Sequence, residues 1–74
     1  MKIDQWVKAD DIELSESERL VIALSHQGLS MKDIGQEMSK SIDTIKSYRK
    51  RIFLKLGVDN INEAIACTML YQLL

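Results

Sequence analysis

Apolar residues recur at helical spacing in four stretches of the chain, and each stretch opens at a residue type that commonly caps helices. Ser15 and Glu18 form a capping box, in which the hydroxyl and the carboxylate each bind a backbone N–H left free at a helix start. That helix ends at Gly28, since glycine adopts the left-handed conformation of a helix end without a clash. Ser30, followed three residues later by Asp33, opens a second, short helix.

Two further helices follow. Ser41 is placed to cap a helix that ends at Gly57, which leaves residues 39 and 40 as the preceding turn. A fourth helix begins near Asn60 or Asn62 and runs almost to the end of the chain. No strand-type alternation of apolar and polar residues occurs, so the sequence predicts an all-α fold of four helices.

The chain divides into a short arm and one domain. We expect an N-terminal arm at residues 1–13 and the helical domain at residues 14–74, a length that allows one modest core. In the arm, Trp6 either anchors the arm on the bundle or contacts a protein partner, and the sequence does not separate these two roles. A start at Met1 favours a short protein that acts alone over a piece of a longer one.

The composition excludes several classes of protein. The chain has one cysteine, Cys67, and one histidine, His26, so it offers no intrachain disulfide and no Cys/His cluster for structural zinc. It also lacks the nucleophile and base pair of a covalent catalyst. We therefore expect no metal, no cofactor and no enzymatic activity. Without a long apolar run or a signal peptide, the sequence predicts a cytoplasmic protein.

The charges are unevenly placed although they sum to −1. Residues 1–18 hold six acidic side chains and two lysines, whereas residues 40–55 hold six cations and only Asp43. At about 100° per residue, Lys46, Ser47 and Lys50 lie on the face of the third helix opposite its apolar residues. This polar row is either a solvated surface or a binding face.

The second and third helices have the packing pattern of a helix-turn-helix. Ile34 and Met38 on one helix, with Ile45 and Tyr48 on the other, would fill the corner between them. Gly35 costs roughly 1 kcal/mol relative to Ala in mid-helix, so it is explained either by the close approach of a second helix or as a tolerated defect. The polar row begins in the first turn of the third helix, the end that such a unit places in the major groove of DNA.

Two stretches, "LSESERLVIALSHQGLSMKDIGQEM" and "SIDTIKSYRKRIFLKLGV", resemble the DNA-binding domain of LuxR/FixJ/GerE-type bacterial transcription regulators, with similarity over about residues 14–70. The resemblance implies a four-helix domain that binds a two-fold symmetric double-stranded DNA site as a homodimer, with the last helix as the dimer contact, and that regulates transcription. The residues that match the family pattern are Leu14, Ser15, Glu18, Gly28, Ser30, Ile34, Gly35, Ser41, Thr44, Ile45, Lys46, Lys55, Leu56, Gly57 and Val58.

The resemblance also assigns roles to single residues. It places Lys46, Ser47 and Lys50 at the positions that face bases, and Ser30, Lys32 and Thr44 near the sugar-phosphate backbone. Asp43 shares the reading face, where it either accepts a hydrogen bond from cytosine or, as we favour, caps the helix start. Lys40 stands where the family usually has an apolar residue, and it becomes an additional phosphate candidate.

The cations that flank the reading face leave alternatives open. Arg49, Arg51 and Lys55 lie to either side of it and are placed to hold phosphates. Arg49 lies nearer the core side, so it pairs instead with Glu18 or Glu37 if it turns inward.

The fourth helix has hardly any polar face, which is unusual for a helix on the outside of a small domain. A homodimer would explain this pattern, because one side would serve the core of the protomer and another side the partner. The alternative is a helix wholly buried within the monomer. We expect Ile65, Cys67 and Met69 to lie at the dimer interface.

A second function remains open at this point. A small helical module that dimerises and regulates another protein, as an adaptor or anti-regulator, would suit the acidic first residues and the net charge of −1. The two functions differ in their response to salt, because phosphate contacts weaken steeply as salt rises and an apolar protein contact does not.

Overall fold

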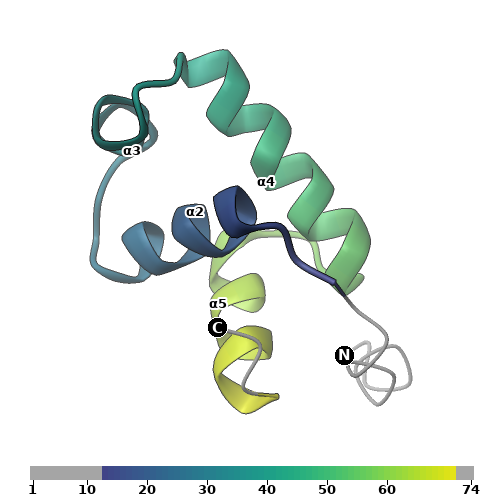
Figure 1. Cartoon of the computed structure of the whole chain (residues 1–74). Coiled ribbons are helices and arrows are strands. Elements are labelled where there is room, and N and C mark those ends of the chain that lie inside the picture. Colours follow the sequence, from purple (N-terminus) through teal and green to yellow (C-terminus); the bar gives the residue numbers. More distant parts are fainter. Residues whose placement is uncertain (1–12, 72–74) are drawn as a thin grey trace.

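The computed structural model describes residues 13–71, which form four helices: α2 (Glu16–His26), α3 (Met31–Met38), α4 (Ile42–Leu56) and α5 (Ile61–Leu70) (Figure 1). The described part of the chain contains no strand, so the predicted all-α class is confirmed. Apart from Glu13, the predicted arm lies outside the described residues, and so does the role of Trp6.

Each helix begins after a capping residue named from the sequence. At α2, Glu18 N donates to Ser15 Oγ at 3.1 Å, and Ser15 N donates to Glu18 Oε1 at 2.8 Å, which confirms the capping box. Ser30 and Ser41 cap α3 and α4 in the same way with one bond each. For α5, Asn60 rather than Asn62 is the cap, and its Oδ1 accepts from Glu63 N at 2.9 Å.

The core lies where the helices meet around α2 and α4. α4 contacts α2, α3 and α5, and α2 contacts α3 and α5 as well. Figure 1 shows α2 in the middle of the bundle, with α3 and α4 on one side and α5 on the other. The apolar side chains with at most 1% of their surface exposed come from all four helices and are Val21, Ile22, Ile34, Ile45, Ile52, Leu56, Ala64 and Cys67.

The corner between α3 and α4 is a tight helix-turn-helix. Ile34 and Ile45 are fully buried there, as expected. A Cβ on Gly35 would lie 2.7 Å from the carbonyl oxygen of Lys40, so the predicted close approach exists, but the backbone concerned is that of the turn. The turn is closed by a 2.8 Å bond from Lys40 N to Gly35 O, and Ser39 adopts a left-handed conformation with φ of 56°.

None of the helices within residues 13–71 combines the length and the apolar character that a membrane crossing requires.

Candidate nucleic-acid interface

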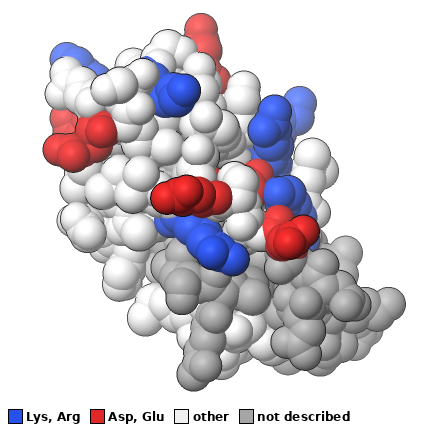
Figure 2. Space-filling model, viewed as in Figure 1, with Lys and Arg blue, Asp and Glu red and all other residues white. Residues whose placement is uncertain are grey.

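The outer face of α4 carries the three side chains predicted to read bases. Lys46, Ser47 and Lys50 are all exposed, whereas Ile45 and Ile52 on the opposite face are fully buried. No carboxylate among the described residues forms an ion pair with the ammonium of Lys46 or Lys50. Figure 2 shows Lys and Arg surface along the outer edge of α4. These cations are therefore free to meet a negatively charged partner.

Ser41, not Asp43, caps the start of α4. Thr44 N donates to Ser41 Oγ at 3.2 Å, and the hydroxyls of Ser41 and Thr44 lie 3.0 Å apart. Asp43 is exposed in the first turn, where a carboxylate interacts favourably with the positive end of the helix dipole. The prediction that Asp43 caps this helix is therefore wrong. Ser41 makes the cap, and the Asp43 carboxylate complements the helix dipole.

The predicted phosphate contacts of α3 and its turn are accessible. Ser30 is exposed and its Oγ accepts from Asp33 N at 3.2 Å, which leaves the hydroxyl hydrogen free to donate. Lys32 and Lys40 are exposed, and neither forms an ion pair with a described carboxylate. Arg51 on α4 is exposed as well. The assignment of these side chains to phosphates stays a prediction.

Lys55 has a structural role that the sequence reading missed. Its ammonium lies 2.7 Å from Glu18 Oε1 and donates to the carbonyl oxygen of Glu13 at 3.0 Å. Glu18 is therefore paired with Lys55, and the suggested pairing of Arg49 with Glu18 or Glu37 is wrong, since neither contact forms. Because its ammonium is committed to the fold, Lys55 is also a poor phosphate ligand.

The Glu18 carboxylate is ionised although only 1% of the side chain is exposed. Burial by itself raises the pKa of Glu18. The hydrogen bond from Lys55, the bonds from Ser15 and the attraction of the Lys55 charge outweigh it and hold the pKa below the ordinary value of 4.5. A signal for this pair exists in the sequence, because Glu18 lies on the same side of α2 as the buried Val21 and Ile22, and a buried carboxylate requires a partner.

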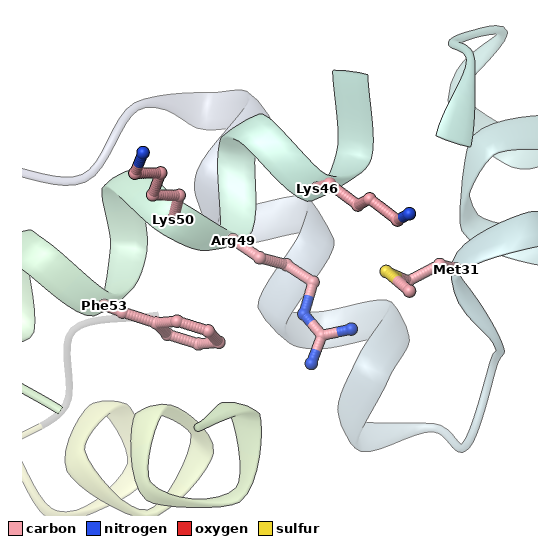
Figure 3. Close-up of a pocket in the computed structure, with 5 residues that line it drawn as sticks. All are labelled: Met31, Lys46, Arg49, Lys50 and Phe53. Carbon is pink, nitrogen blue, oxygen red and sulfur yellow. The ribbon is translucent and has the colours of Figure 1, made fainter. Parts of the chain in front are cut away.

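Arg49 lies against a ring rather than a carboxylate. Its guanidinium carbon is 5.7 Å from the centre of the Phe53 ring, a cation–π contact. Together with Met31, Lys46 and Lys50, these two residues line a hollow of about 260 Å³ between the start of α3 and the middle of α4 (Figure 3). This hollow adjoins the base-reading face because both include Lys46 and Lys50.

The two sides of α5 differ. Ala64, Cys67 and Thr68 are fully buried, whereas Met69 is 58% exposed and Leu70 is 64% exposed. Cys67 has no surface to offer a second chain, so its assignment to a dimer interface is wrong and it belongs to the core. Burial raises the pKa of the Cys67 thiol accordingly. Ile65 is half-buried, and it remains in the predicted interface with Met69.

The sequence of this domain matches a known protein family. Residues 13–68 match the family described as bacterial regulatory proteins, luxR family. Two relatives come from Escherichia coli (strain K12). The cyclic di-GMP phosphodiesterase PdeL is 40% identical over 47 residues, which are 64% of this chain and 13% of that protein. The transcriptional activator protein BglJ is 30% identical over 57 residues, which are 77% of this chain and 25% of that protein.

The chain thus spans a quarter or less of the length of these two relatives. The family match, by contrast, extends from the residue before Leu14 into α5 and includes the whole helix-turn-helix. The protein therefore belongs to the luxR family of bacterial regulatory proteins.

Proposed function

We propose that the protein binds double-stranded DNA as a homodimer and regulates transcription, with α4 in the major groove and Lys46, Ser47 and Lys50 at the base edges. The observation that carries the proposal is that the ammonium groups of Lys46 and Lys50 are exposed on the outer face of α4 and pair with no carboxylate of residues 13–71. Membership of a family of bacterial regulatory proteins supports it, and so does the similarity to a transcriptional activator. The short match to a phosphodiesterase supports no catalytic activity in this chain.

The side chains of this face suit a combination of base contacts and phosphate contacts. A lysine ammonium donates hydrogen bonds to the O6 and N7 acceptors of guanine, and a serine hydroxyl discriminates bases only weakly. Two lysines and one serine therefore give specificity at a few base pairs per half-site. The remaining affinity comes from phosphate contacts, for which the candidates are Ser30, Lys32, Lys40, Thr44, Arg49 and Arg51.

The proposed dimer uses the outer face of α5. A helix with Cys67 and Ala64 turned into the core and Met69 and Leu70 turned outward exposes apolar surface that a second copy would cover. Two-fold pairing through one helix makes each protomer present the same patch, which suits a symmetric DNA site.

Selection of DNA fragments from a random pool tests the DNA function. The selected duplex is then titrated with the protein at several salt concentrations. We expect two-fold symmetric sites and an affinity that falls steeply as salt rises, because each phosphate contact releases counterions. A pool that yields no enriched sequence, together with binding that ignores salt, would instead support the protein-interaction module.

Sedimentation tests the dimer. The substitution Met69→Asp places a charge in the proposed interface and should leave a monomer with the helical content of the parent, which circular dichroism checks. Leu54→Asp is a matched control, because Leu54 is 75% exposed on α4 and the same charge there should not change the mass. An unchanged mass for Met69→Asp would refute this interface.

A further inference from the structure

The hollow beside α4 combines cations with apolar walls. Lys46 and Arg49 extend from α4 toward Met31, the first residue of α3, whereas Lys50 extends away from it (Figure 3). Met31 and Phe53 are both half-buried and packed against the core, so the floor of the hollow is a fixed part of the fold. The hollow has a volume of about 260 Å³ and is open to solvent.

Arg49 is held in a defined place without being neutralised. The Phe53 ring lies 5.7 Å from its guanidinium carbon, and no described carboxylate pairs with it. A cation–π contact uses the face of the guanidinium and leaves its N–H edge for an acceptor. That edge presents two parallel N–H donors, which can bind two oxygens of one phosphate at the same time.

The position of the hollow favours a phosphate of the DNA backbone as its ligand. It adjoins the start of α3, where backbone N–H groups lack helical partners and the dipole favours negative charge. It also adjoins the face of α4 that carries the base-reading side chains. In the proposed complex, the DNA strand whose bases meet Lys46 and Lys50 would run its backbone along the side of α4.

We propose that this hollow binds one phosphodiester of the DNA backbone in each half-site, with Arg49 as its ligand and Phe53 as the positioning residue that aims the guanidinium. The apolar walls of Met31 and Phe53 accommodate the carbon atoms of the adjoining deoxyribose. This inference rests on the proposed function and adds the site, the ligand group and the role of Phe53 to it.

Salt-dependent binding of the full chain to its selected duplex tests the site. Arg49→Gln should lower the slope of log affinity against log salt by about 1.8 on cognate and unrelated sequences alike, because the dimer loses one phosphate contact, worth about 0.9, in each of its two half-sites. Base preference should not change. An unaltered slope in Arg49→Gln, or a loss confined to one base pair, would overturn the proposal.

A double-mutant cycle tests the positioning role. Phe53→Leu keeps an apolar side chain in the core and removes the ring, so it should weaken binding in the parent and have no further effect in Arg49→Gln. Arg51→Gln is the matched control, since Arg51 is exposed on the other side of α4 and Phe53→Leu should keep its full effect there. Equal losses in both backgrounds would show that Phe53 acts only through stability, which thermal melts monitor independently.

A scan with single neutral methylphosphonate linkages locates the phosphate. The parent should lose affinity at one linkage per half-site that Arg49→Gln no longer senses. If the parent binds DNA with steep salt dependence but no linkage loses its effect in Arg49→Gln, this inference fails alone. If the parent binds no DNA, the proposed function fails and this inference with it.

Discussion

Two parts of α4 use the same residue type for opposite purposes. Near the end of the helix, the ammonium of Lys55 is bound to Glu18 and to the Glu13 carbonyl. Between its start and its middle, Lys46 and Lys50 are exposed and have no carboxylate partner among the described residues. One helix therefore carries lysines that serve the fold and lysines that remain available for a ligand.

The difference shows that a basic stretch cannot be assigned as a whole. Lys55 faces the buried stripe of α2, where an ionised Glu18 needs a compensating charge. Lys50 faces water, where its charge costs nothing to keep and stabilises nothing in the free protein. The candidates for ligand binding are therefore the cations that have no partner within the described part of the fold.

Lys55→Met should have the largest effect on stability. It leaves the Glu18 carboxylate buried without its cation, and we expect the free energy of unfolding to fall by about 2 to 3 kcal/mol. The 39% exposure of Lys55 keeps the loss below that of a fully buried pair. Urea unfolding measures it. A loss under about 0.5 kcal/mol, the usual range for surface substitutions, would show that Lys55 belongs with the surface lysines.

Lys50→Met makes the same substitution at an exposed lysine that has no described carboxylate partner. We expect the free energy of unfolding to stay within about 0.5 kcal/mol of the parent, while affinity for the selected duplex falls by about 1 to 3 kcal/mol. Anisotropy titrations on cognate and single-base variants measure the second effect. Equal losses on every sequence would move Lys50 from base reading to phosphate binding.

Acid should weaken the parent more than Lys55→Met. Since the pKa of Glu18 is held below its ordinary value in the folded state, the pair stabilises the protein above about pH 4.5 and loses that contribution as pH falls through the lowered pKa. Without Lys55, burial raises the pKa of Glu18 and this loss shrinks or reverses. Urea unfolding at a series of pH values measures the free energy of unfolding of the parent and of Lys55→Met. If the two free energies fall in parallel as the pH is lowered, the pairing of Glu18 with Lys55 does not lower the pKa of Glu18.

Ser41→Ala should destabilise the protein less than Lys55→Met does. It removes the hydroxyl that accepts from Thr44 N at the start of α4, and we expect a loss of about 1 kcal/mol in the free energy of unfolding. Ser47→Ala is the control, because Ser47 is exposed in the second turn of the helix and caps nothing. Thermal melts measure both variants, and equal melting temperatures would show that the cap contributes little.

Most of the fold could be predicted because its signals are local. Ser15, Ser30 and Ser41 cap helices as the sequence indicates, and Gly57 ends α4 with a positive φ. A cap depends only on residues within one turn of it, so a short stretch of sequence is enough to predict it. The exposed face of α4 follows from helical period alone, which is why Lys46, Ser47 and Lys50 were placed on it correctly.

The pairings between helices could not be predicted in this way. Glu18 and Lys55 are 37 positions apart, and their contact depends on how α2 crosses α4, which periodicity does not specify. The same limit explains why Arg49 was given a carboxylate partner instead of Phe53. For Cys67, composition showed that α5 was apolar on most sides but not which side the core would take.

The bond from Lys55 to the Glu13 carbonyl has a mechanical consequence. It fastens the backbone just ahead of α2 to the far end of α4 across a short bridge that bypasses the interior of the bundle. The same ammonium pairs with Glu18 in the first turn of α2, so one side chain joins both the start of α2 and the residue ahead of its cap to the last turn of α4. Replacing Lys55 therefore removes both links at once.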